Sequence, residues 1–296
     1  MSGTVLVTGA DGFIGKCLVV ALESLAYRVQ AHSIADGDLA HCALPYRDIA
    51  HVFHLAGKAF VPDSWTDPRS FYETNVLATV NVLDFCRRSR ASLTFISSYV
   101  YGTPGVIPVP EDQPLQAFNP YCHSKILAEE VCRFYTVQHG LQIAIVRPFN
   151  IYGPGQDGRF LIPTLVRQAL APDSSVIEVA DVRPRRDFLY ISDLIDLLVA
   201  TMLQGGSGAY NAGSGVSTSI QEIVAILNRI APRPKPLVSR GESRPQEVLD
   251  LAADIRKAER ELHWKPRVDI AAGLQLTMES ALHHAGIVAR RSTELP

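Results

Sequence analysis

One tyrosine and one lysine stand four residues apart in a segment that the sequence predicts to be helical. Tyr121 and Lys125 lie within residues 121–135, directly after Pro120, a frequent first residue of a helix. Residues at this spacing share a helix face, so the Lys125 ammonium should favour the phenolate of Tyr121 and lower its pKa. Such a phenol can exchange a proton with a sugar hydroxyl or ketone while a hydride moves at carbon. The alternative is a surface pair, because the spacing is frequent by chance.

Two adjacent serines follow a predicted strand at residues 93–96. A hydroxyl at Ser97 or Ser98 would polarise the carbonyl oxygen that Tyr121 protonates. Counting from the strand favours Ser98, and counting back from residues 100–102 favours Ser97, so both remain candidates. The alternative is that either serine only caps the strand. The nine histidines show no metal-ligand spacing, and we expect no metal site.

A glycine-rich turn follows the first predicted strand, residues 4–7. Gly9, Gly12 and Gly15 precede a helical pattern that begins at Ile14. Glycines permit a tight turn and let a pyrophosphate approach the backbone, while the N-terminus of the helix attracts the phosphates. The position of this turn after an N-terminal strand favours a dinucleotide site over an ordinary strand-to-helix connection.

No carboxylate stands at the end of the second predicted strand, residues 27–31. In this fold an acid about 20 residues past the glycine loop usually binds the NAD ribose. Here the strand leads into His32 and Ser33, which with Arg28 are candidate donors to a 2′-phosphate, so NADP(H) is favoured. The alternative is that Asp36 folds back to the ribose and that the cofactor is NAD(H).

The connection over residues 32–50 is short for this fold. A strand–helix–strand unit takes about 30 residues, so one crossover of the sheet is expected to be missing. We predict a stunted strand at residues 37–39 in its place, which would put Asp38 and Leu39 near the adenine.

Strands and helices alternate through the first 150 residues, which predicts a doubly wound parallel sheet with helices on both faces. After Asn150 the pattern changes to a loop rich in glycine and then to further helices. We expect a dinucleotide-binding domain at 1–150 plus about 184–218, and a smaller α/β domain at 151–183 and 219–290. Further helices are predicted at residues 14–25, 71–86, 160–170, 193–202, 219–230, 254–262 and 271–284, and strands at 51–55, 141–146 and 176–179.

Composition restricts the partners. With 28 Lys and Arg against 30 Asp and Glu, the net charge is −2, which argues against binding to nucleic acid or to an anionic membrane. No apolar run approaches the roughly 20 residues of a membrane span, and residues 1–10 lack the basic start of a secretory signal. Five scattered cysteines suit reduced thiols. We therefore expect a cytoplasmic protein.

Taken together and in this order, the motifs resemble the extended short-chain dehydrogenases/reductases that act on nucleotide sugars, the NAD-dependent epimerase/dehydratase family. The likeness covers about residues 4–285 and implies a Rossmann-type fold. Its motifs are residues 8–15, 54–57, 97–98, 121–125 and 147–150, extended by 185–188, 243–245 and 253–266.

The resemblance implies roles for individual residues. Asn150 would contact the sugar diphosphate, and Arg186 and Arg244 would pair with its phosphates; the alternative for either arginine is a salt bridge. A homodimer through residues 67–88 and 121–138 is also implied, unless those helix faces only serve the core. Besides Tyr121 and Lys125, the implied cofactor contacts are Gly9, Gly12, Phe13, Ile14, Gly15, Leu55, Ala56, Gly57, Asn75 and Phe149.

Residues 54–68 and 147–156, with the short connection after the second strand, are similar to the GDP-4-keto-6-deoxy-mannose reductases. The expected activity is therefore NAD(P)H-dependent reduction of a nucleotide-linked 4-keto-6-deoxyhexose at C4. The alternative is a nucleotide-hexose 4-epimerase with tightly bound NAD. A 4,6-dehydratase is disfavoured because Tyr99 and Val100 follow the serines where those enzymes carry an acidic pair. A non-catalytic protein of this fold is disfavoured because Tyr121 and Lys125 are both present.

Overall fold

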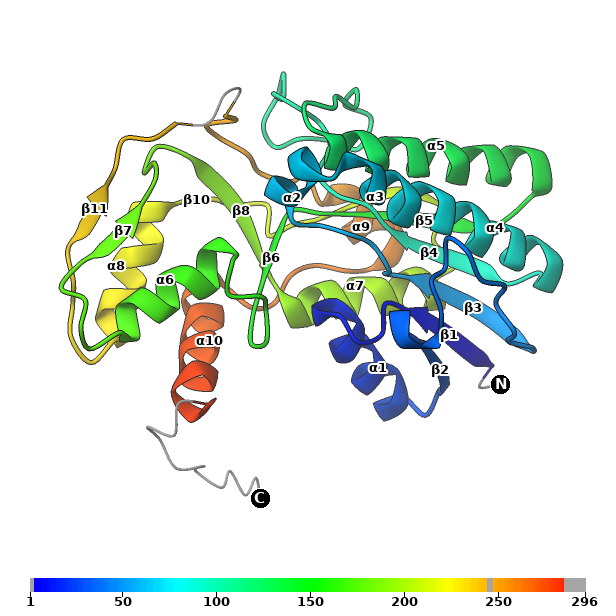
Figure 1. The fold of residues 1–296 in the computed structure, drawn as a ribbon, viewed down its shortest axis with the longest axis horizontal. Helices are drawn as coiled ribbons and strands as arrows, with labels where there is room; N and C mark the ends of the chain where they lie inside the picture. Colours follow the sequence, from blue (N-terminus) through cyan, green and yellow to red (C-terminus); the bar gives the residue numbers. More distant parts are fainter. Residues whose placement is uncertain (1–2, 244–246, 285–296) are drawn as a thin grey trace.

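A parallel sheet of six strands forms the centre of the molecule (Figure 1). The computed structural model describes residues 3–243 and 247–284. The strands lie in the order β2-β1-β3-β4-β5-β9, and each neighbouring pair runs parallel. The doubly wound α/β fold predicted from the sequence is therefore confirmed. The strands are Thr4–Thr8 (β1), Arg28–His32 (β2), Ile49–His54 (β3), Ser92–Ile96 (β4), Ile143–Pro148 (β5) and Gly208–Ala212 (β9).

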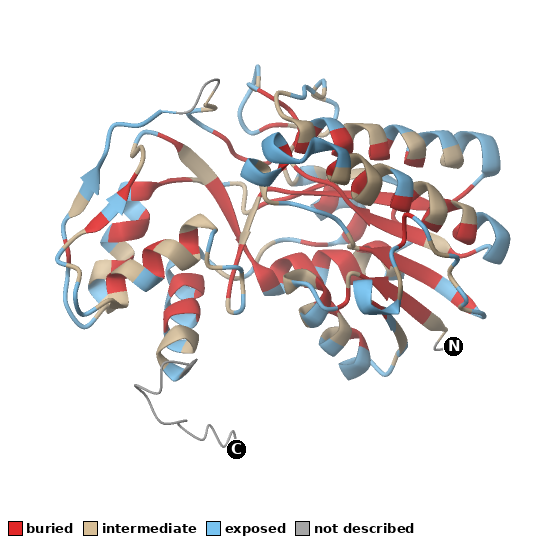
Figure 2. Ribbon diagram, viewed as in Figure 1, coloured by how far each residue is buried: buried red, intermediate tan, exposed pale blue. Residues whose placement is uncertain are grey.

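Helices cover both faces of this sheet. Helices α1 (Phe13–Ser24) and α7 (Ile191–Leu203) lie on one face, and α4 (Ala78–Ser89) and α5 (Pro120–His139) on the other (Figure 1). The central strands are consequently buried along most of their length (Figure 2). This double burial explains why the strands appear in the sequence as continuous apolar runs instead of alternating ones.

The helix predicted over residues 71–86 is interrupted. Short helices α2 (Val61–Thr66) and α3 (Pro68–Tyr72) come first, and a π-helical turn, Glu73–Leu77, then leads into α4. A π turn inserts an extra residue into the helical ladder, which redirects the side chains around it. Asn75 lies in this turn and is fully buried.

The short connection after β2 confirms the missing crossover, because β3 lies directly beside β1 and β2 is left at the edge of the sheet. The strand predicted at residues 37–39 is wrong. Residues Ile34–Asp36 form a 3₁₀ turn, and Asp38 Oδ1 accepts a hydrogen bond from Ala40 N at 2.9 Å. The side-chain amide of Asn81 donates to the carbonyls of Leu39 and Ala40 at 2.8 and 3.1 Å. A side chain thus satisfies backbone groups that would otherwise need a strand partner.

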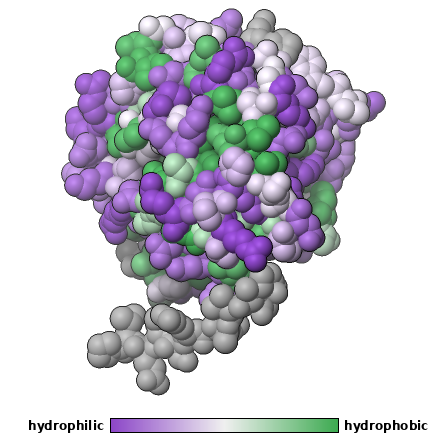
Figure 3. Space-filling view, turned by 90° about the vertical axis from the view of Figure 1, so that its left-hand side faces the viewer, coloured by the Kyte–Doolittle hydropathy of each residue, from purple (hydrophilic) through white to green (hydrophobic). Residues whose placement is uncertain are grey.

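Among the described residues, a second region contains two small sheets and three helices. Strands β6 (Asn150–Tyr152), β8 (Arg185–Tyr190) and β10 (Ser217–Ser219) form one sheet; β7 (Ile177–Val179) and β11 (Leu237–Ser239) form the other. Its outward surface mixes hydrophilic and hydrophobic side chains (Figure 3). Its helices are α6 (Leu161–Leu170), α8 (Ile220–Ile230) and α10 (Ile270–His284), whereas α9 (Arg256–Leu262) packs against β9 and α7 at the large sheet.

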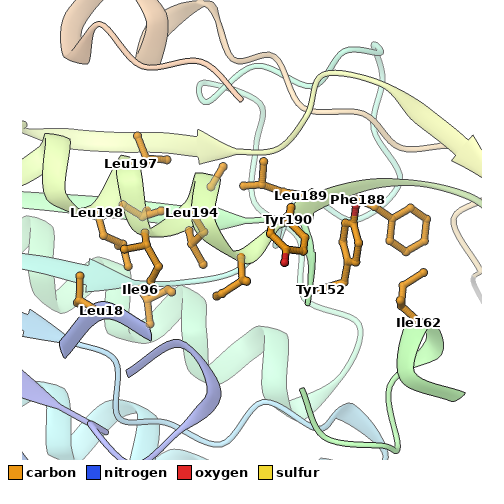
Figure 4. Packing of buried hydrophobic residues seen from close by; sticks show 14 of the residues in the cluster. Leu18, Ile96, Tyr152, Ile162, Phe188, Leu189, Tyr190, Leu194, Leu197 and Leu198 are labelled. Carbon is orange, nitrogen blue, oxygen red and sulfur yellow. The ribbon is translucent and has the colours of Figure 1, made fainter. Parts of the chain in front are cut away.

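One hydrophobic core joins the two regions. It runs from Leu18 on α1 through Leu194 on α7 to Tyr190, and on to Tyr152 and Ile162 at α6 (Figure 4). Because interiors are close-packed, this shared core fixes the strands of the second region relative to the large sheet.

Some properties can be read directly from the described residues. Within residues 3–243 and 247–284, no helix is long and apolar enough to cross a membrane. In the same ranges, no group of three His, Cys, Asp or Glu side chains is placed to hold a metal ion. The five cysteines are free thiols, and Cys86, Cys122 and Cys132 are buried.

Candidate active site

Tyr121 lies in the first turn of α5. Asn119 caps this helix by accepting a hydrogen bond from Cys122 N at 2.7 Å, and Pro120 occupies the first helical position. The Tyr121 ring packs edge-on against Phe71, with the ring centres 6.3 Å apart. Burial raises the pKa of the Tyr121 phenol above its ordinary range, and a hydrogen bond with the Ser98 side chain acts in the opposite direction.

The expected lowering of the Tyr121 pKa is therefore absent. Lys125 donates from Nζ to the carbonyl of Ile96 at 2.8 Å, and its Nζ lies 4.9 Å from the centre of the Phe95 ring. Burial lowers the pKa of Lys125 to about 8, an effect that the nearby Glu129 partly offsets. At neutral pH the Tyr121 phenol is protonated, and Lys125, one turn further along α5, is still mostly charged.

The structure separates the two serine candidates. Ser98 shares a hydrogen bond with Tyr121, whereas the Ser97 hydroxyl donates to Glu129 Oε1 at 2.6 Å. Both serines are buried. Only Ser98 therefore has its hydroxyl at the phenol.

Glu129 is a residue of this site that the sequence interpretation missed. It is fully buried and forms a two-pronged ion pair with Arg147, with Nη2–Oε2 at 2.7 Å and Nε–Oε1 at 3.0 Å. Arg147 also donates from Nη1 to Tyr101 Oη at 2.9 Å and to the Glu111 carbonyl at 2.8 Å. The spacing was visible in the sequence, because residues 121, 125 and 129 fall at i, i+4 and i+8 on one helix face.

The glycine turn lies against the loop that follows β3. Gly9 has φ +69°, and a Cβ added to it would lie 2.7 Å from Ala56 N. A Cβ on Gly15 would overlap the Gly9 carbonyl. Gly12 caps α1 without a side-chain hydrogen bond, and Phe13 and Ile14 form the first turn. The cradle therefore has room only for backbone, which fits the close approach of a pyrophosphate.

The loop after β3 also reaches helix α5. Leu55 N donates to the Thr8 carbonyl at 3.2 Å. A Cβ on Gly57 would lie 2.9 Å from Asn75 Oδ1 and 3.4 Å from Lys125 Nζ. The π turn with Asn75 is thus brought next to Lys125, and the implied contacts Leu55, Ala56, Gly57 and Asn75 lie together.

The residues after β2 have other partners. The two ring nitrogens of His32 share hydrogen bonds with Tyr46 Oη and with the Gly37 carbonyl, both at 3.0 Å. The Ser33 hydroxyl donates to Asp36 Oδ2 at 2.9 Å. Leu39 is buried in the core beneath α4, whereas Asp38 is exposed.

The implied substrate residues lie on β6 and β8. Asn150 donates from Nδ2 to the Asp187 carbonyl at 3.0 Å, next to Arg186. Arg186 forms an ion pair with Glu247 and donates to the Val248 carbonyl at 2.6 Å. Phe149 is buried and stacks on Tyr99, with ring centres 5.5 Å apart. Arg244 lies outside the described residues.

The fold and this site define a class of protein. Residues 5–213 match the model of the NAD dependent epimerase/dehydratase family, and the chain belongs to that family. It is 30% identical to the GDP-6-deoxy-D-mannose reductase of Pseudomonas aeruginosa over 93% of this chain and 96% of that protein.

Two solved structures are similar over nearly their whole length. MoeE5 in complex with UDP-glucose and NAD has a TM-score of 0.87 at 29% identity, covering 96% of this chain and 100% of MoeE5. RMD from Pseudomonas aeruginosa complexed with NADPH has a TM-score of 0.86 at 27% identity, covering 95% of this chain and 99% of RMD. Both of these neighbours bind a pyridine dinucleotide, but in different forms.

Proposed function

We propose that the protein reduces a nucleotide-linked 4-keto-6-deoxyhexose at C4. The observation that carries this proposal is the Tyr121 phenol at Ser98, whose pKa burial holds above its ordinary range, with the buried ammonium of Lys125 one turn further along α5. A phenol that remains protonated is suited to donate a proton to a carbonyl oxygen. The similarity to a GDP-6-deoxy-D-mannose reductase supports the same reaction.

The roles of the side chains follow from their contacts. Tyr121 donates its proton to O4 of the sugar, and the Ser98 hydroxyl donates a hydrogen bond to the same oxygen as negative charge develops there. Lys125 supplies positive charge at the end of β4, where its buried ammonium is bound to the Ile96 carbonyl. Gly9, Gly12, Gly15 and Gly57 would hold a dinucleotide, which supplies the hydride when bound.

The second region is proposed to hold the substrate. Asn150 and Arg186, with Arg244, would bind the sugar diphosphate, for which Arg186 must exchange its ion pair with Glu247. The proposed division is 1–150 plus about 184–218 for the dinucleotide, and 151–183 with 219–290 for the nucleotide sugar, except that β8, which carries Arg186, lies in a sheet of the second region and α9 packs against the large sheet. Strand β9 supports the first assignment because it pairs with β5 in the large sheet.

A nucleotide-hexose 4-epimerase is the second candidate. The same three residues can act in both directions, and an exposed carboxylate after β2, Asp36, favours the NAD that an epimerase retains. A dehydratase is less well supported. The positions after Ser98 hold Tyr99, which stacks on Phe149, and the buried Val100, and neither side chain can eliminate water.

A screen of nucleotide-linked 4-keto-6-deoxyhexoses with NADH and NADPH tests the proposal. Continuous loss of absorbance at the nicotinamide band, with one reduced sugar formed per dinucleotide oxidised, is the expected result. Tightly bound NAD in the purified protein and epimerised product without net consumption would establish the second candidate instead.

We further propose a cytoplasmic homodimer in which α4 and α5 pack against their mates. Phe134 and Val137 on α5 are exposed by 57% and 76%, and Leu77 before α4 by 41%. Exposed apolar side chains on two adjacent helices suit a protein–protein contact. Light scattering should give twice the chain mass, and Val137→Glu should reduce it to one chain mass.

A further inference from the structure

A buried carboxylate of β8 joins three segments of the chain. Asp187 is fully buried, and its side chain accepts four hydrogen bonds from uncharged donors. Oδ1 accepts from Ser214 N at 2.6 Å and Ser214 Oγ at 2.7 Å, and Oδ2 accepts from Gly215 N at 2.9 Å and Ala253 N at 3.0 Å. The packing is so close that a Cβ added to Gly213 would lie 2.5 Å from Oδ2. Asp187 thereby fastens β8 to the turn after β9 and to the segment that leads to Ala253.

The segment that leads to Ala253 covers Arg186, the neighbour of Asp187. Arg186 forms an ion pair with Glu247, and its Nη1 donates to the Val248 carbonyl at 2.6 Å. These contacts leave the Arg186 side chain only 15% exposed. Arg186 therefore depends for its position on a segment whose other end is held by the Asp187 carboxylate.

The turn after β9 leads into β10, which pairs with β8. Thr218 of β10 lies opposite Arg186, and Ser217 lies opposite Asp187. On the other side of β8, Asn150 of β6 donates to the Asp187 carbonyl at 3.0 Å. Successive residues of a strand point to opposite faces, so the Asp187 carboxylate does not share the face from which Arg186 projects. Any effect of Asp187 on a ligand of Arg186 must pass through the segments that it holds.

We infer that Asp187 is a positioning residue that sets Arg186 for a nucleoside diphosphate, by holding the turn after β9 and the segment before Ala253 in place. The inference rests on the proposed function, in which Arg186 and Asn150 bind the diphosphate of the nucleotide sugar. Loosening Asp187 should weaken the binding of a nucleoside diphosphate. It should leave the dinucleotide unaffected, because the glycine turn follows β1, and β3, β4 and β5 separate β1 from β9.

Asp187→Asn tests the inference by calorimetry on the full chain. Both carboxylate oxygens accept from a backbone N–H, so an amide turned either way sets its NH₂ group against at least one of these donors. The probe is GDP or UDP, whichever the unaltered protein binds more tightly when it is saturated with NAD⁺ or NADP⁺. We expect the Kd of this nucleoside diphosphate to rise about tenfold, as for the loss of one hydrogen bond to a charged group. The Kd of the dinucleotide should stay unchanged.

Ser214→Ala is a milder variant, because it removes only the hydroxyl that donates to Oδ1 of Asp187. It should raise the Kd of the nucleoside diphosphate by about threefold, again without a change for the dinucleotide.

Asp193→Asn is the matched control. Asp193 is 1% exposed, and its Oδ2 accepts a hydrogen bond from Val268 N at 3.0 Å, which fastens α7 to the chain before α10. Burial raises the pKa of both aspartates. We expect Asp193→Asn and Asp187→Asn to lower the urea midpoint of unfolding to a similar extent, but Asp193→Asn should leave the Kd of the nucleoside diphosphate unchanged.

An unchanged Kd of the nucleoside diphosphate in Asp187→Asn and Ser214→Ala would overturn the inference alone, as would an equal rise in Asp193→Asn. If Asp187→Asn does not fold, the comparison of Ser214→Ala with Asp193→Asn still decides. If the unaltered protein binds a dinucleotide but neither GDP nor UDP, the inference and the proposed function both fail.

Discussion

The ends of two strands, β4 and β2, differ sharply in how they are held. At the end of β4, three consecutive residues meet one face of α5. Lys125 binds the Ile96 carbonyl, Glu129 accepts from Ser97, and Tyr121 shares a hydrogen bond with Ser98. The end of β2 instead leads into an exposed turn, in which Asp36 is fixed by Ser33 three residues before it.

The difference follows what each site must do. A proton donor must keep its position to within a fraction of an ångström, and a buried network of ionic hydrogen bonds provides that rigidity. Selection between two dinucleotides needs only one charge near one phosphate, which a surface turn can supply. We therefore expect changes at the end of β4 to cost activity or stability heavily, and changes at the end of β2 to alter only cofactor choice.

The largest effect is expected from Tyr121→Phe. Removal of the proton donor should lower kcat by about 10³-fold, within the range for general acid catalysis. The Kd for the dinucleotide should remain unchanged, because the ring keeps its packing against Phe71. Steady-state kinetics and calorimetry on the same preparation test this, and undiminished turnover would refute the assigned donor.

Glu129→Ala tests how strongly the end of β4 depends on its buried ion pair, through the free energy of unfolding. Removal of one member of a buried ion pair leaves Arg147 uncompensated and should cost about 3–5 kcal/mol in the free energy of unfolding. Arg133→Ala is the matched control: its contact with Glu129 is 3.1 Å long but its side chain is 47% exposed, so about 1 kcal/mol or less is expected. Urea unfolding measures both, and equal losses would mean that Arg147 does not depend on Glu129.

The two serines should respond differently. Ser98→Ala should lower kcat by about 10²-fold with little change in stability, as for loss of one donor to a developing oxyanion. Ser97→Ala should leave kcat close to that of the unaltered protein but lower the free energy of unfolding by about 1–3 kcal/mol. A larger kcat loss in Ser97→Ala than in Ser98→Ala would reverse the assignment.

The pH dependence of kcat should reveal the titration of Lys125. Its pKa is lowered to about 8 by burial, so kcat should fall above that pH by about tenfold per unit as the ammonium is lost. Stability should change in the other direction. Between about pH 8 and the ordinary lysine value near ~10.4, the unfolded chain binds more protons, so this group's contribution to stability rises with pH. A kcat that stays level to pH 10 would show that the charge of Lys125 is not needed.

Much of the fold was accessible from the sequence because it depends on local patterns. Apolar runs and the glycine turn predicted the parallel sheet, and the length of residues 32–50 predicted the lost crossover. The strand expected at residues 37–39 failed because the amide of Asn81, more than 40 residues away, satisfies that backbone. The interruption at Asn75 was also missed, since a π turn leaves the apolar pattern of a helix nearly unchanged.

Most residues of the site were predicted from the sequence, but their pKa shifts and their ionic partners were not. Tyr121, Lys125 and the serine pair were identified from type and spacing, whereas the choice between Ser97 and Ser98 required the position of Glu129. The direction of the Tyr121 pKa was wrong because sequence spacing does not reveal burial. Asp36 was recognised only as an alternative, because its hydrogen bonds to Ser33 depend on a local 3₁₀ turn.

The central claim is that Tyr121 and its neighbours reduce a 4-keto sugar with net transfer of hydrogen. The most direct measurement uses NADH carrying deuterium at the transferable position of its nicotinamide C4, with a nucleotide-linked 4-keto-6-deoxyhexose, and locates the label by mass spectrometry and NMR. We expect one deuterium at C4 of the deoxysugar for each NADH oxidised. A product without deuterium, formed while NADH is not consumed, would contradict the account.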